Sequence, residues 1–319
     1  MTKPWTSVAA MMLVEDGSIQ LTEPVSRCLP ALKGLKVSVA RPDPGGVSAW
    51  TLVPADREPT IQDLLRHTSG FAYDFVTANA PVREAHVGSK LEALKGEIRD
   101  VITASEMVER LSKAPLAFQP GTTWNYSLST AILGRVIEAV SGMRLSRFLE
   151  ERLFAPLRMT DSGFSVPQDK GGRIAQPLMP YAVIQIFDPT VPPANDLGGE
   201  GGMSTASDYL RFDQMLLDGG KLGNARIPSR STVALMTADH LGPNIAAPIH
   251  PGQILLGVPG YTFGLGFMVR QGAGVPGSPG EFMWGAPPEP SSGWIPRSSW
   301  RWCTCRSGRS ARGPTAAGS

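Results

Sequence analysis

Lys3 is the residue of this sequence with the clearest potential for chemistry. It stands shortly before the segment from Trp5 to Glu15, which is apolar on nearly every side. A lysine amine at the mouth of an apolar helix loses solvation, which disfavours its ammonium form and suits it to act as a base. Ser-x-x-Lys is a known catalytic motif, and its spacing puts the serine hydroxyl and the lysine amine on one helix face. We therefore expect Lys3 to be the lysine of a Ser-x-x-Lys pair.

The serine of this pair would fall directly before Met1, and no Ser-x-x-Lys occurs elsewhere in the 319 residues. We expect the codon before Met1 to encode serine, with a strand-rich segment upstream of it. On this interpretation the chain is truncated at its N-terminus and begins inside a catalytic motif. It would lack the nucleophile and would be inactive in acyl transfer, since loss of such a serine costs on the order of a millionfold in turnover.

The element that would position Lys3 is predicted by the apolar run that follows it. Residues 5–15 are apolar on nearly every side, which indicates a helix buried all round. Asp16 and Gly17 follow, and a glycine at this point is typical of a helix C-terminus. The N-terminus of a buried helix offers amide donors and a favourable dipole to a reacting group.

The rest of the chain reads as a helix-rich middle followed by antiparallel strands. Residues 60–63 resemble a capping box, whereas residues 40–59 and 165–202 are rich in Pro and Gly and are expected to be loops. Period-two alternation predicts one strand over residues 261–270 and another over 281–285. This order indicates an α+β fold, a mostly antiparallel sheet flanked by helices with a helical subdomain. The helices are expected over residues 105–113, 128–141, 145–153 and 205–217.

Composition restricts the classes of partner. The chain is 42% hydrophobic and 18% charged with a formal net charge of +2, which fits a globular protein without a nucleic-acid or membrane-surface partner. It has no apolar run long enough for a membrane span, and the absence of a signal peptide in this chain favours a cytoplasmic location. Cys28, Cys303 and Cys305 lack the number for a disulfide framework and the spacing for structural zinc. We expect no metal and no cofactor.

The composition changes abruptly at residue 286, where Pro, Arg, Ser, Gly, Trp and Cys begin to dominate and periodicity ends. We expect residues 1–285 to form one incomplete domain and residues 286–319 an aberrant, disordered tail. A genuine basic tail is the alternative, but such tails rarely carry several tryptophans and two cysteines. A shifted reading frame fits better, because residues 300–305 can be back-translated and read one base earlier as Leu-Ala-Val-Val-Tyr-Met, a strong strand sequence.

Six segments carry a family signal through their order and spacing rather than through any one motif. They are residues 1–4, 64–71, 119–121, 126–128, 202–210 and 282–285. Taken together, they make residues 1–285 resemble the serine β-lactamase-like superfamily, in particular the class C β-lactamases and the family VIII carboxylesterases. The resemblance implies a β-lactamase/transpeptidase-like fold.

The resemblance also implies a mechanism in which a serine attacks an acyl carbonyl while a lysine and a tyrosine handle its proton. Carried over residue by residue, Lys3 is this lysine and Tyr126 the tyrosine. Ser127, Trp284 and Gly285 are expected to bind the substrate. The alternatives without a catalytic role are that Lys3 is an ordinary terminal lysine and that Tyr126 is a core tyrosine with a hydrogen-bonded hydroxyl group.

Two positions separate the subfamilies. Class C β-lactamases carry Tyr-x-Asn as their second motif. Here Leu128 stands at the third position, so the side-chain amide that would hold an amide substrate is missing. Lactamases carry Lys-Thr-Gly in the third motif, whereas Trp284-Gly285 resembles the Trp-Gly-Gly of the esterases. A site without a cation for a substrate carboxylate should prefer neutral esters. Small carboxylic esters are therefore the expected substrates of the intact parent. A β-lactamase or D-alanyl-D-alanine peptidase acting on an amide is one alternative, and a non-catalytic, defective homologue is another.

His67 stands in a segment that looks catalytic, but we expect it to be structural. The segment lies at a helix end, where Gly70 can supply the C-cap and the neighbouring hydroxyls can satisfy backbone groups. A His-dependent triad is not expected, because no Gly-x-Ser-x-Gly elbow is present. The nearest match includes Ser204 and Thr205, but it precedes a helix and is better explained as an N-cap.

Overall fold

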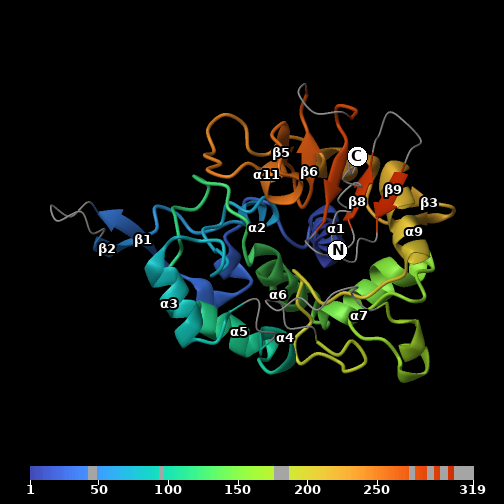
Figure 1. Ribbon diagram of the computed structural model, residues 1–319, viewed down its shortest axis with the longest axis horizontal. Coiled ribbons are helices and arrows are strands. Elements are labelled where there is room, and N and C mark those ends of the chain that lie inside the picture. The colour runs from blue at the N-terminus through green and yellow to red at the C-terminus, as the bar shows by residue number, and fades with distance from the viewer. Residues whose placement is uncertain are drawn as a thin grey trace, which may run out of the picture.

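The computed structural model describes residues 1–41, 49–92, 97–175, 187–272 and 277–285, together with the strand segments 291–294 and 301–304. Within these residues the chain has an α+β fold, as the sequence predicted (Figure 1). A five-stranded antiparallel sheet lies above a group of helices, and a two-stranded hairpin projects from one end. No helix in the described part of the chain is long and apolar enough to cross a membrane.

Helix α1 (Thr2–Glu15) runs through the centre of the molecule. Every residue from Thr2 to Leu13 is buried, because the helix packs on α6 and α7 on one side and reaches the sheet on the other (Figure 1). Gly17 follows with a φ of +76°, a conformation that glycine adopts without strain. The prediction of a helix buried all round is confirmed.

The predicted helices of the middle region are also present. Thr60 and Asp63 form the capping box of α2, Gly142 ends α6 in the left-handed conformation, and Thr205 caps α9. The further helical elements among the described residues are α2 (Ile61–Leu65), α3 (Ala80–Gly88), α4 (Glu97–Asp100), α5 (Ala104–Leu111), α6 (Ser129–Ser141), α7 (Leu145–Leu149), α8 (Ala155–Leu157), α9 (Ala206–Leu217), α10 (Arg230–Met236) and α11 (Pro251–Leu256), the 3₁₀ turns η1 (Val25–Arg27), η2 (Pro30–Leu32) and η5 (Gln168–Arg173), and the π-helical turn η4 (Glu150–Phe154).

The main sheet is formed by strands that follow one another in the sequence. Each strand pairs antiparallel with the next, so the spatial order equals the chain order. The strands are β5 (Tyr261–Phe263), β6 (Met268–Arg270), β7 (Phe282–Trp284), β8 (Ser291–Trp294) and β9 (Arg301–Thr304).

The single strand predicted over residues 261–270 is wrong, because this segment is the β5–β6 hairpin with Phe263 opposite Met268. Gly266 lies in its turn with a φ of +93°, and a Cβ atom there would stand 2.2 Å from the Ser7 hydroxyl oxygen of α1. Only glycine allows the turn to approach α1 this closely. Every residue from Tyr261 to Arg270 is buried, so the alternation of large and small side chains did not mark one exposed face.

The hairpin at the left of Figure 1 is a second correction. Residues 40–59 were expected to be a loop, but β1 (Lys36–Arg41) pairs antiparallel with β2 (Ala49–Pro54). The Pro- and Gly-rich stretch between the strands dominated the composition and concealed them. A smaller hairpin joins β3 (Lys221–Leu222) to β4 (Ala225–Arg226).

The region expected to be a disordered tail contributes two strands. β8 and β9 lie within residues 286–319 and extend the sheet beyond β7, so their backbone differs from the expectation of disorder. The remainder of 286–319 lies outside the described residues. The domain limit at residue 285 and the shifted reading frame remain predictions.

Candidate active site

Lys3 occupies the first turn of α1 and its side chain is turned into the protein. Its Nζ atom donates a hydrogen bond of 2.7 Å to the carbonyl oxygen of Gly199. The same atom lies 4.9 Å from the centre of the Tyr126 ring and 5.8 Å from that of Tyr73. The helix start therefore holds an amine between a backbone acceptor and two phenols.

Tyr126 lies in the segment that leads into α6, where four parts of the chain meet. Its ring centre is 5.3 Å from that of Tyr73 and 5.2 Å from that of His67, both in the segment after α2. The ring of Trp284, at the end of β7, lies 5.2 Å away on another side. The structure thus brings Lys3, Tyr126 and Trp284 together, while their predicted roles in catalysis and substrate binding remain predictions.

Gly285 and Ser127, the other two predicted substrate-binding residues, lie in different surroundings. Gly285 is buried and directly follows Trp284, at the point where β7 ends. Ser127 is only 1% exposed, and its hydroxyl oxygen lies 3.0 Å from Nδ1 of His67 and 2.5 Å from the hydroxyl oxygen of Ser129. Because these groups surround the Ser127 hydroxyl, it holds the loop in place, and this position does not favour the substrate contact that we predicted.

The fold and this cluster can now be compared with known proteins. A family model described as Beta-lactamase matches residues 1–294. The chain belongs to the beta-lactamase family. Protein Rv1367c of Mycobacterium tuberculosis is 36% identical over 249 residues, which are 76% of this chain and 58% of that protein. Lovastatin esterase of Penicillium rubens is 30% identical over 262 residues, which are 77% of this chain and 60% of that enzyme. The chain spans about three fifths of the length of these two relatives.

Solved structures give the same fold. EstCE1, a hydrolase with promiscuous acyltransferase activity, matches with a TM-score of 0.69 at 26% identity, covering 93% of this chain and 75% of EstCE1. These findings confirm the resemblance to the serine β-lactamase-like superfamily and the β-lactamase/transpeptidase-like fold.

The charge of Lys3 differs from the sequence-based expectation. Burial alone lowers the pKa of Lys3, but the oxygens of Tyr126 and Tyr73 and the carboxylate of Glu200 raise it by more, above its usual range. The expectation of an amine neutralised by desolvation is therefore wrong in direction, because the helix mouth that surrounds Lys3 is polar. The pKa of Tyr73 is also raised, in this case by burial, which outweighs the opposing effect of the nearby Lys3. A cationic Lys3 suits the orientation and stabilisation of oxygen atoms at this position.

Sequence reasoning missed Tyr73, Gly199 and Glu200. Tyr73 is 4% exposed and stands three positions after Gly70, two residues beyond the 64–71 segment that carries the family signal. Gly199 and Glu200 belong to residues 198–202, where four glycines surround one glutamate. Such a run signals close backbone approach, and this signal was available in the sequence.

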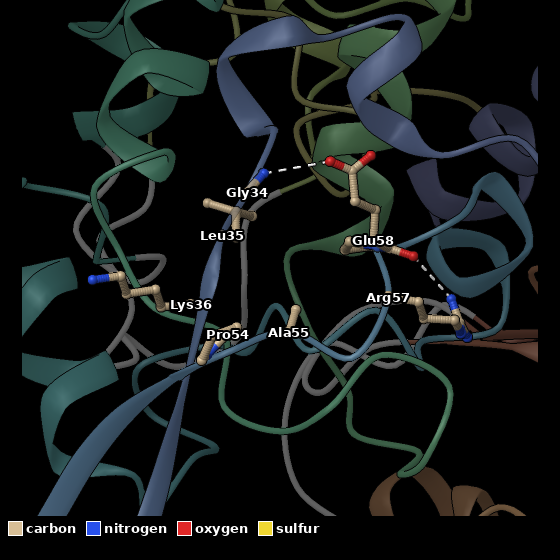
Figure 2. Close-up of a pocket in the computed structure, with 8 residues that line it drawn as sticks. Gly34, Leu35, Lys36, Pro54, Ala55, Arg57 and Glu58 are labelled. Carbon is tan, nitrogen blue, oxygen red and sulfur yellow. Dashed lines mark hydrogen bonds between the residues drawn. The ribbon is translucent and has the colours of Figure 1, made fainter.

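A separate cavity of about 320 Å³ lies at the base of the β1–β2 hairpin and is not this site. Figure 2 shows the Glu58 side chain turned toward the Gly34 nitrogen, with the Lys36 amine on the opposite side of the hollow. None of the predicted site residues is among those that line it, which are Gly34, Leu35, Lys36, Pro54, Ala55, Arg57, Glu58 and Pro59.

Proposed function

We propose that the intact parent of this chain hydrolyses small carboxylic esters through an acyl-enzyme. A serine directly before Met1 would be the nucleophile, and Lys3 and Tyr126 would handle its proton. The observation that carries the proposal is the position of the Lys3 amine, in the first turn of α1 and 4.9 Å from the centre of the Tyr126 ring. Lovastatin esterase and the hydrolase EstCE1, by their names, support this class of reaction.

In the proposed reaction the serine oxygen attacks the ester carbonyl carbon, and its proton passes to the Lys3–Tyr126 pair. The Lys3–Tyr126 pair can accept this proton only if either the Lys3 amine is neutral or the Tyr126 hydroxyl has lost its proton. The carbon–oxygen bond of the ester then breaks, and the departing oxygen takes up that proton and leaves as the alcohol. Water repeats these steps on the acyl-serine, which releases the carboxylic acid and restores the serine hydroxyl.

The surroundings of the pair favour a neutral ester over a β-lactam. Leu128, two residues after Tyr126, is 3% exposed and offers no amide to hold an amide substrate. The carboxylate of Glu200 acts on Lys3 electrostatically, and its negative charge disfavours a substrate that carries a carboxylate of its own.

The nucleophile of this proposal is a serine directly before Met1, and a form of the protein that carries it can be compared with one that does not. The test compares this chain with a serine-extended form, in which a start codon and a serine codon precede Met1, and with a matched alanine-extended form. A hydroxyl-reactive phosphonate should label the added serine and leave the other two proteins unlabelled. The serine-extended form should also release p-nitrophenol from short-chain esters.

Other outcomes would overturn parts of the proposal. Stoichiometric labelling of the original chain at Ser7, Ser127 or Ser204 would show that the nucleophile is elsewhere. A serine-extended form that unfolds cooperatively but is not labelled would refute the Lys3–Tyr126 assignment. Hydrolysis of a chromogenic cephalosporin without ester turnover would favour the β-lactamase alternative.

A further inference from the structure

His67 has a backbone conformation that its surroundings must enforce. Its φ is +59°, in the left-handed region that only a few per cent of non-glycine residues adopt. Its side chain is 2% exposed. A buried residue keeps such a conformation where the structure around it fixes it from several directions, and residues of this kind cluster at functional sites.

Three contacts tie His67 to the segment that carries Tyr126. The His67 carbonyl oxygen accepts a hydrogen bond of 3.0 Å from the Asn125 backbone nitrogen, on one side of Tyr126. Its Nδ1 atom lies 3.0 Å from the hydroxyl oxygen of Ser127, on the other side. The imidazole also meets the Tyr126 ring edge-on, with 5.2 Å between the ring centres. Tyr126 is therefore held through the residue before it, through the residue after it and through its own ring.

A chain of buried hydroxyls sets the direction of the hydrogen bond to His67. The Ser69 hydroxyl oxygen accepts from the Phe71 backbone nitrogen at 3.3 Å and lies 2.7 Å from the hydroxyl oxygen of Ser129. The Ser129 hydroxyl lies 2.5 Å from that of Ser127. If Ser69 donates to Ser129, Ser129 to Ser127, and Ser127 to His67 Nδ1, every hydroxyl proton is used. The reverse direction leaves the Ser69 proton without an acceptor among the described residues.

The charge of the ring agrees with this direction. Burial, together with the positive charge of Lys3, lowers the pKa of His67 to about 3. The imidazole is therefore neutral at ordinary pH, with one nitrogen that accepts and one that carries a proton. Since Nδ1 accepts from Ser127, the proton resides on Nε2.

We propose that His67 is a positioning residue for Tyr126, acting as a neutral, Nε2-protonated imidazole that fixes the phenol relative to the Lys3 amine. The proposal rests on the proposed function in giving Tyr126 a role in proton transfer. His67 itself neither takes up nor delivers a proton. It differs from the His of a triad in this respect, and from a purely structural residue in that the reaction depends on the geometry it imposes.

The first test needs no catalysis and uses the chain as it exists. Nitrogen-15 NMR of histidine-labelled protein should show His67 as the Nε2–H tautomer, unchanged between about pH 5 and pH 8. His67→Asn assigns the signal, because asparagine tolerates the left-handed conformation and its amide oxygen can accept from Ser127. An Nδ1–H tautomer, or a ring that titrates in this range, would overturn the proposal whether or not the protein is an esterase.

The second test uses ester turnover by the serine-extended form. His67→Asn can keep the contacts to Asn125 and Ser127 but removes the ring that packs on Tyr126. It should reduce kcat by about 10²-fold and change KM little, because a phenol free to move by about 1 Å no longer meets the reacting groups. It should also displace the kcat–pH profile, since the phenol shares its surroundings with Lys3, Tyr73 and Glu200. His86→Asn is the matched control, because His86 is also 2% exposed but belongs to α3. It should lower stability while leaving kcat and the pH profile in place.

A purely structural role would give a different pattern. His67→Asn would then lower the unfolding midpoint as His86→Asn does, with kcat per folded molecule and the pH profile unchanged, and the proposal would be refuted. A serine-extended form without any turnover would instead refute the proposed esterase function, while the tautomer measurement still decides the state of His67.

Discussion

Asp63 offers the sharpest test of how the site is supported. Its side chain is fully buried at the start of α2, the helix that leads into His67. It accepts hydrogen bonds from Arg57 at 2.5 and 3.0 Å, from Arg66 at 3.0 Å and from the Thr68 hydroxyl at 2.8 Å. One carboxylate therefore joins the helix start to both cations and to the residue after His67.

These contacts make stability depend on pH. Burial alone would raise the pKa of Asp63, but the hydrogen bonds from Arg57 and its other partners lower it from 3.8 to about 2. A carboxyl group whose pKa is lower in the folded state stabilises the protein above its unfolded pKa. This contribution is lost as the pH falls from about 4 to about 2. A difference of nearly two pKa units corresponds to about 2 kcal/mol, a sizeable part of a net stability of roughly 5–15 kcal/mol.

Asp63→Asn removes the charge and leaves two arginines without their anionic partner. Breaking a buried ion pair costs about 3–5 kcal/mol, and we expect the lower end because the Arg57 side chain is 42% exposed. Urea denaturation at pH 7 measures this loss. The same titration between pH 5 and pH 2 should be less steep in Asp63→Asn than in the unaltered chain, by about 2 kcal/mol over the range.

Asp169→Asn is the control, because Asp169 lies exposed in η5. Its unfolding free energy should stay within about 0.5 kcal/mol of that of the unaltered chain. Equal unfolding free energies for Asp63→Asn and the unaltered chain at pH 7, or parallel curves down to pH 2, would refute the assignment of Asp63 as the support of this segment.

Three further predictions test other parts of the structure. Gly266→Ala should lower the free energy of unfolding in urea by about 3 kcal/mol, because a Cβ atom there meets the Ser7 hydroxyl at 2.2 Å. The control Gly257→Ala should lower it by about 1 kcal/mol, since nothing lies within 4 Å of a Cβ atom there. Equal losses would contradict the packing argument. Ser129→Ala breaks the buried hydroxyl chain and should cost about 1–3 kcal/mol, and an unchanged midpoint would show that the chain contributes nothing. In the serine-extended form, Lys3→Met should slow phosphonate labelling by about 10²–10⁴-fold, and an unchanged labelling rate would show that the amine is not needed.

The elements that sequence patterns predicted well are those defined by local signals. α1 could be predicted from its many apolar residues and from Gly17 after it, and α9 from Thr205 at its N-cap. The β5–β6 hairpin was missed for a physical reason, because the segment is buried on both faces and its periodicity held no information about exposure. The turn depends on Ser7, more than 250 residues away, which no local pattern contains.

The site shows the same division. Lys3, Tyr126 and Trp284 could be named from motif order, and the structure brings them together. The state of Lys3 could not be predicted, because its pKa depends on burial, on Tyr126 and also on Tyr73 and Glu200, and these last two groups reach it only through the tertiary fold. The placement of Ser127 among buried hydroxyls likewise depends on a loop that approaches from another part of the chain.

The long separations between partners also set the order in which this protein can assemble. The hydrogen bond from Lys3 to Gly199 spans 196 positions, and that from Tyr209 to the Met1 carbonyl spans 208. Contacts of such high order fold slowly, because closure entropy is lost before the contact forms. At roughly 5–20 residues synthesised per second, α1 is made about 15–55 s before Trp284. During that interval the apolar surface of α1 is exposed, because the sheet that will cover it has not been synthesised. We therefore expect the nascent chain to bind chaperones that recognise exposed apolar segments.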